Sequence, residues 1–146
     1  MYTVVAALVS IAFVAIAIWH FVMAFSAETG SSLAIPSVNG KPLFVPSRRA
    51  TISVGVALLA FAVLVIATAG IVSVGLPLRL LSWLSYALAL GLVARAIGEF
   101  RYVGFFKRVR ESKFAKADTF VYSPLCLLLA LGVVLVAIHN DIHFTR

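Results

Sequence analysis

Five side chains near the ends of long apolar segments could bind an anion or exchange a proton: His20, Arg95, Glu99, Asp118 and Tyr122. The guanidinium of Arg95 is the anion-binding group of this set, and His20 or Glu99 is the titrating group. Ionisable residues inside membrane segments are candidates for a functional site. We therefore expect a site for a small anionic or amphipathic ligand. The same residues could instead form an interfacial belt of aromatic side chains and ion pairs, or a proton relay for transport.

Arg95 and Glu99 are four residues apart, so they share one face of a helix. They adjoin a stripe of small residues, and such stripes let two helices approach closely. We expect both charged side chains to point into a helix bundle and away from lipid. The stripe consists of Ala87, Gly91, Ala94 and Gly98.

Other arrangements of catalytic or metal-binding residues are missing from the sequence. It contains no Ser-His-Asp order, phosphate-binding loop or HExxH motif. The single cysteine, Cys126, excludes an intrachain disulfide and a CxxC redox pair. His139 and His143 flank Asp141, which is a weak metal signal and more typical of a solvated helix end. We expect no catalytic residue, no metal and no cofactor.

The elements that position these residues are membrane helices. The chain is 63% hydrophobic and 12% charged, against about 25% charged residues in soluble domains. Four segments are long and apolar enough to cross the bilayer, which takes about 20 residues per helix. Each must be helical, because only then are its backbone N–H and C=O groups paired in lipid. The first is too long for a signal peptide and has no basic start. The sequence predicts one all-α domain, 1–146, a four-helix transmembrane bundle with spans 2–25, 51–74, 78–98 and 124–139.

The basic residues are distributed unevenly between the two sides of the membrane. Loops 26–50 and 99–123 lie on one side, and the opposite side has only Arg79 and Arg146. Because basic loops stay in the cytoplasm, we expect both loops there and both termini outside. We expect the chain, with its net charge of +7, to interact with anionic lipid headgroups rather than with nucleic acid. The loop cations are Lys41, Arg48, Arg49, Arg101, Lys107, Arg108, Arg110, Lys113 and Lys116.

Both cytoplasmic loops contain local structural signals. Asn39-Gly40 between apolar pairs predicts a short hairpin that caps the bundle or covers a cavity as a lid. Residues 102–111 have an aromatic face and a basic face, which predicts an interfacial helix that anchors on lipid or docks a partner protein. Ser123-Pro124 is a typical helix start. The expected membrane-surface residues are Arg101, Phe105, Phe106, Lys107, Arg108 and Arg110.

The run GEFRYVGFFKRV, followed by KFAKADTFVYSPLCLLLALG, resembles a family of small bacterial integral membrane proteins described only as a domain of unknown function. The likeness is strongest from Gly98 to Cys126 and extends more weakly to an early Trp-His in the first span. It implies a bacterial protein with four membrane helices, so the expected location is a bacterial inner membrane. No catalytic or binding residue can be assigned from this resemblance.

Brevity, few acids and missing catalytic motifs favour a non-catalytic membrane protein. It would be an accessory subunit of a membrane complex or a binder of lipid or another amphipathic ligand, with membrane lipids, a partner protein or further copies of itself as partners. The alternative is a small transporter or proton-coupled carrier that uses an intramembrane Arg95/Glu99 pair. A membrane enzyme with His20 or Glu99 as base is a third possibility.

Overall fold

The computed structural model describes residues 2–26, 34–38 and 41–144, with side chains described as far as 142. Four of its helices are long and apolar enough to cross a membrane. This confirms the predicted all-α architecture with four membrane helices. The elements are α1 (Tyr2–Phe25), β1 (Ser37–Val38), β2 (Lys41–Pro42), α2 (Arg48–Thr68), α3 (Leu78–Ile97), α4 (Lys113–Ala117), a single π-helical turn η1 (Asp118–Tyr122) and α5 (Ser123–Phe144).

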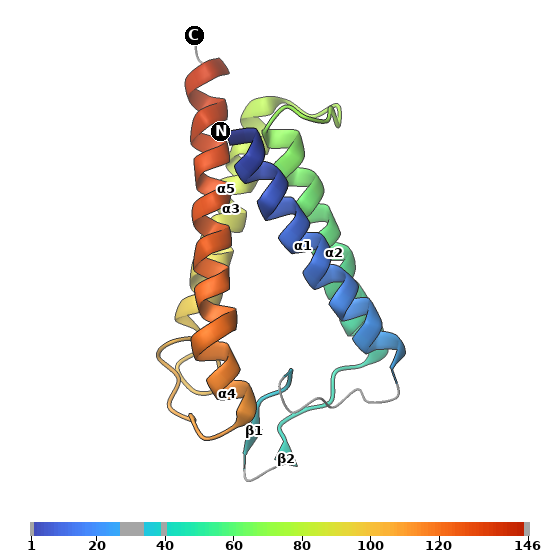
Figure 1. Cartoon of the computed structure of the whole chain (residues 1–146), viewed down its shortest axis with the longest axis vertical. Coiled ribbons are helices and arrows are strands. Elements are labelled where there is room, and N and C mark those ends of the chain that lie inside the picture. The colour runs from blue at the N-terminus through green and yellow to red at the C-terminus, as the bar shows by residue number, and fades with distance from the viewer. Residues whose placement is uncertain (1, 27–33, 39–40, 145–146) are drawn as a thin grey trace.

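The long helices form two antiparallel pairs, α1 with α2 and α3 with α5. The pairs diverge toward the end that holds the hairpin and α4 (Figure 1). They are joined by an apolar core in which Phe13 and Val133 are almost fully buried. Gly132 lets α1 approach, because a Cβ there would collide with the side chain of Val9. The core consists of Ala6, Val9, Phe13, Ala62, Val65, Ala89, Leu129, Ala130, Val133 and Val136.

Several buried or partly buried polar side chains add specific contacts between these helices. Each of these contacts joins two neighbouring helices and avoids the large desolvation cost of an unpaired polar group in a membrane interior. The contacts are Ser10 Oγ to the Ala62 carbonyl (3.1 Å), Thr68 Oγ1 with Ser85 Oγ (2.9 Å), Asn140 Nδ2 to Ser82 Oγ (2.8 Å) and Tyr86 hydroxyl to Asp141 Oδ2 (2.7 Å).

The described parts of both loops that were expected on one side lie at one end of the molecule, and the α2–α3 turn, the start of α1 and the end of α5 lie at the other (Figure 1). The predicted hairpin is confirmed: β1 and β2 pair antiparallel, with Val38 opposite Lys41. Asn39 and Gly40 themselves fall outside the described residues.

Two of the four membrane helices differ from the predicted spans by more than one residue, the second and the fourth. The second helix begins at Arg48, where Ser47 Oγ accepts the amide of Ala50 (3.2 Å), and it ends at Thr68 rather than at 74. Gly70 adopts a φ of 71°, which breaks the helix. The fourth membrane helix starts earlier than predicted, because α4, η1 and α5 run on continuously from Lys113. Ser123 is therefore an interior residue, and Ser112 caps the helix by accepting the amide of Ala115.

The predicted amphipathic helix over 102–111 is wrong, and the chain there is an irregular loop. Three of the residues between 98 and 104 have left-handed backbone angles: Gly98 (φ 83°), Phe100 (φ 66°) and Gly104 (φ 88°). A right-handed helix cannot contain such angles. The hydrophobic periodicity was real, but the glycines and a buried lysine direct the backbone back toward the fourth helix.

Candidate functional site

A buried carboxylate is the centre of the cluster where the third and fourth membrane helices meet the 98–112 loop. Asp118 is fully buried, and both of its oxygens accept hydrogen bonds. Oδ1 accepts from Arg95 Nη2 at 2.8 Å, and Oδ2 accepts from the Gly104 amide at 2.6 Å. Lys107 Nζ donates to Oδ2 at 3.1 Å. One carboxylate thus joins α3, the loop and η1.

Lys107 is also buried, with 1% of its surface exposed. Its ammonium group donates to the Gly104 carbonyl at 2.8 Å and to Thr119 Oγ1 at 2.6 Å, besides Asp118. These three bonds use all three ammonium hydrogens. Full pairing is what makes the burial tolerable, because an unpaired buried charge is strongly destabilising.

A tight crossing of the backbone positions the Gly104 amide at Asp118. A Cβ at Gly98 would overlap the carbonyl of Val103, and one at Gly104 would overlap the carbonyl of Ile97. The Phe105 amide donates to the Ala96 carbonyl at 2.9 Å, which fixes the returning chain against the end of α3. Both positions therefore require glycine. Each has a positive φ, and each lies against the backbone next to the other glycine, where a Cβ would not fit.

The π-helical turn η1 begins at Asp118 itself. A π-turn contains one residue more than an α-helical turn and is common at functional sites. It continues into α5, where Ser123 is fully buried and its hydroxyl has no hydrogen-bond partner among the described residues. Arg95 Nη1 is a second buried donor without a partner in that part of the chain.

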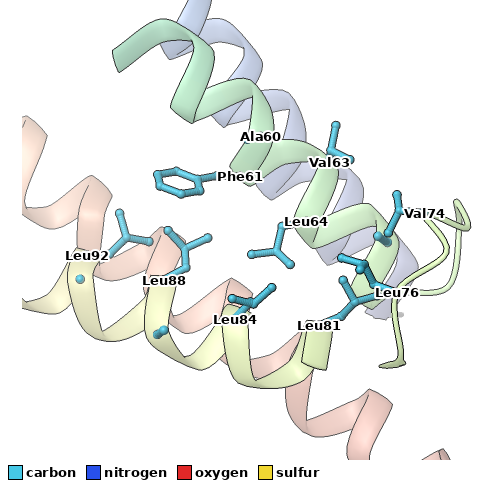
Figure 2. Close-up of a pocket in the computed structure, with 13 residues that line it drawn as sticks. Ala60, Phe61, Val63, Leu64, Val74, Leu76, Leu81, Leu84, Leu88 and Leu92 are labelled. Atoms are coloured by element: carbon cyan, nitrogen blue, oxygen red, sulfur yellow. The ribbon is translucent and has the colours of Figure 1, made fainter. Parts of the chain in front are cut away.

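An apolar groove lies between α2 and α3 (Figure 2). Its volume is about 730 Å³. Leucines of α3 face Phe61 and Leu64 of α2 across it, and Val74 and Leu76 close one end. Val63 and Leu84 stay substantially exposed at its mouth, so it opens sideways. The lining residues are Ala60, Phe61, Val63, Leu64, Ala67, Val74, Leu76, Leu81, Leu84, Ala87, Leu88, Gly91 and Leu92.

The five predicted site residues are only partly brought together. Arg95 and Asp118 form an ion pair. Glu99 does not pair with Arg95: its exposed carboxylate accepts the amide of Tyr102 at 2.6 Å, because the helix ends before it. His20 on α1 contacts the carbonyl of its own helix at Ile16, at 2.8 Å. The ring of Tyr122 packs near that of Phe114, and the two ring centroids are 6.1 Å apart.

Sequence reasoning missed Gly104 and Thr119 and placed Lys107 on the membrane surface. That placement of Lys107 is wrong. The residue is buried against Asp118, because this carboxylate attracts its ammonium group more strongly than the membrane surface does. Of the other expected surface residues, Phe105 is half-buried and the rest are exposed: Arg101, Phe106, Arg108 and Arg110. The signal that could have found the cluster is the pair of glycines in a charged segment.

The family comparison covers nearly all of these elements. The model of a family described as "Protein of unknown function (DUF3995)" matches residues 13–133. The chain belongs to this family. That agrees with the resemblance to a domain of unknown function. The matched residues of this DUF3995 protein include the Asp118 cluster and the whole α2–α3 groove. Searches of curated proteins and of solved structures gave no match.

The chemistry open to this DUF3995 protein follows from how the cluster is bonded. Both oxygens of Asp118 are occupied by donors, so the carboxylate is poorly placed to take a proton from a substrate. Arg95, by contrast, keeps one buried nitrogen without a partner among the residues that the structure describes. In the described part of the chain, no three His, Cys, Asp or Glu side chains gather as a metal site. The arrangement is suited to holding a guanidinium in a fixed position.

Proposed function

We propose that this protein is a non-catalytic membrane protein that binds a lipid or a similar long-chain amphipathic molecule in the groove between α2 and α3. The observation that carries the proposal is the groove itself. It lies between two membrane helices, and its lining residues are all apolar. Its volume of about 730 Å³ falls in the range of about 300 to 1,000 Å³ typical of small-molecule sites.

The shape of the groove favours a chain-like occupant. Leu81, Leu84, Leu88 and Leu92 extend along α3 for about three turns, which matches a long hydrocarbon chain better than a compact ligand. The site has no polar lining residue that would orient a polar substrate. Gly91 leaves open space beside it, because no atom of the described part of the chain lies within 4 Å of where its Cβ would be.

We further propose that the end with both loops faces the cytoplasm of a bacterial inner membrane. The exposed cations Arg101, Arg108 and Arg110 flank the exposed rings of Phe100 and Phe106, whose centroids are 6.4 Å apart. Aromatic rings of this kind enter the headgroup layer, and each cation near anionic lipid contributes about 1 kcal/mol. The 98–112 loop would then contact anionic headgroups without being a helix.

Gly91→Phe is expected to remove the bound lipid. The phenyl ring would fill the open space at Gly91, so the amount of lipid that co-purifies in a mild detergent should fall by roughly tenfold or more, equivalent to at least about 1.4 kcal/mol of binding. Mass spectrometry of the purified protein measures it. Instability would not explain the loss, because replacing an interior helical glycine tends to strengthen a helix.

Leu90→Phe is the matched control for this change. Leu90 is 70% exposed on the same helix and is not part of the groove, so this variant should retain the lipid. Unchanged lipid content in Gly91→Phe would refute the proposal. If instead a protein co-purifies with the wild type and is lost from Gly91→Phe, the groove binds a partner helix and the protein is an accessory subunit.

Arg108→Cys tests the orientation. In a Cys126→Ala background, a membrane-impermeant maleimide added to intact cells should label Arg108→Cys only after the membrane is opened. Val72→Cys, in the turn between α2 and α3, should be labelled at once, because it is exposed at the opposite end. The reverse pattern of labelling would overturn the orientation.

A further inference from the structure

The groove and the Asp118 cluster are connected along one face of α3. Leu81, Leu84, Leu88, Gly91 and Arg95 follow each other at intervals of three and four residues. Residues so spaced lie above one another on a helix. Arg95 is thus one turn beyond the end of the groove, on the face that lines it.

We propose that the ligand of this groove carries a negatively charged head group, bound by Arg95, with Asp118 as the residue that positions the guanidinium. The inference rests on the proposed function and specifies its ligand class. The acyl chain would lie along the leucines of α3, and the acidic head would lie at Arg95. Either a carboxylate or a phosphate has the required chemistry.

The bonding of Arg95 supports a head group at this place. Nη2 is held by Asp118 at 2.8 Å, while Nη1 is buried and has no partner among the described residues. Nη1 itself is covered, but the side chain as a whole has 37% of its surface exposed, so a head group that arrives at the exposed part would need only a small rotation of the guanidinium to accept from Nη1. A guanidinium fixed by one nitrogen loses little freedom when it binds an anion with another.

The charges of the cluster favour an anion over a cation. Arg95 and Lys107 each contribute one positive charge, and Asp118 contributes one negative charge, so the three groups are positive by one unit. All three hydrogens of Lys107 are used within the cluster. A cationic ligand would find no free carboxylate oxygen, because both oxygens of Asp118 already accept hydrogen bonds.

The test compares four probes on the full-length protein in a neutral detergent by native mass spectrometry. Oleate and oleoyl lysophosphatidate carry an acidic head, oleyl alcohol has the same chain without charge, and inorganic phosphate has no chain. We expect both acidic lipids to bind about tenfold or more tightly than oleyl alcohol, because hydrogen bonds to charged groups are strong. The tighter of the two acidic lipids identifies the head group. Inorganic phosphate that binds as tightly as the acidic lipids would overturn the proposal.

Arg95→Gln should lower the affinity for the acidic lipids by about tenfold or more and leave oleyl alcohol unaffected. Arg49→Gln, which removes an exposed cation at the same end, should change neither. Equal binding of acidic and neutral lipids by the wild type, or an equal loss of both in Arg95→Gln, would overturn the inference. A merely structural role of Arg95 would lower both together.

Two further variants keep the outcome interpretable. If Arg95→Gln does not fold, the triple variant Arg95→Gln with Lys107→Met and Asp118→Asn replaces all three charged side chains of the cluster by neutral ones and leaves no buried charge unpaired, and the same loss of preference is expected. Gly91→Phe separates this inference from the proposed function. If it blocks oleyl alcohol and the acidic lipids alike while the wild type shows no preference, the groove binds lipid and the head-group assignment fails. If it blocks none of them, the proposed function itself fails.

Discussion

Asp118→Ala should lower the free energy of unfolding by about 3 to 5 kcal/mol, the usual cost of removing one partner of a buried ion pair. The change leaves the Lys107 ammonium buried without its counter-ion and removes the acceptor of Arg95 and of the Gly104 amide. Lys107 and the Gly104 amide then lose a partner away from water, and Arg95 loses one in a partly buried place. Equilibrium unfolding of the purified protein in mixed micelles measures the loss.

Glu111→Ala is the matched control, because Glu111 is an exposed acid on the same loop. It should change the free energy of unfolding by no more than about 0.5 kcal/mol. The double variant Lys107→Met with Asp118→Asn should cost less than the two single changes added together, since the single changes each leave a buried charge behind. Strict additivity would contradict the assignment of Lys107 and Asp118 as a coupled pair.

Hydropathy was sufficient to predict that four membrane helices exist, although it misplaced the ends of the second and the fourth. Apolar segments of sufficient length have no other stable form in lipid, so α1 and α3 were predicted to within one residue of their observed ends. The hairpin followed from Asn39-Gly40 between apolar pairs, because few other dipeptides accept the required backbone angles. In each case a local preference decides the structure, and a sequence displays local preferences directly.

The 98–112 loop could not be predicted in the same way. Its residues have helical periodicity, but its path depends on Lys107 reaching Asp118 across eleven residues. Sequence spacing places both residues at one membrane depth and gives no information on whether they touch. The expected pair of Glu99 with Arg95 failed because it also relied on spacing. Two residues four apart are neighbours only while the helix continues, and α3 ends at Ile97.

The groove was beyond sequence reasoning altogether. Gly91 and Ala87 were interpreted as part of a stripe that lets helices pack closely, and the structure places them instead beside open space between α2 and α3. Small residues permit both outcomes. Which one occurs depends on how the two helix pairs pack on each other, and that packing involves core residues far apart in the sequence, such as Phe13 and Val133.

Gly98→Ala and Gly104→Ala should each destabilise the protein by about 3 kcal/mol or more. A left-handed backbone costs an ordinary residue about 1 to 2 kcal/mol, and forcing an added methyl group into a packed place costs about 1 to 3 kcal/mol more. The methyl group would meet backbone carbonyls, of Val103 in one case and Ile97 in the other. Backbone cannot move aside as a flexible side chain can, so the crossing would open and withdraw the Gly104 amide from Asp118.

Gly75→Ala separates the two contributions. Gly75 has a φ of 71°, close to those of Gly98 and Gly104, but nothing lies within 4 Å of its Cβ position. It should therefore lose only the conformational part, about 1 to 2 kcal/mol. Equal losses at all three glycines would mean that the crossing of 98 and 104 contributes nothing to stability. A larger loss at Gly98 and Gly104, together with a loss of the lipid preference that depends on Arg95, would instead show that the glycine crossing maintains the position of Asp118 and, through it, the guanidinium.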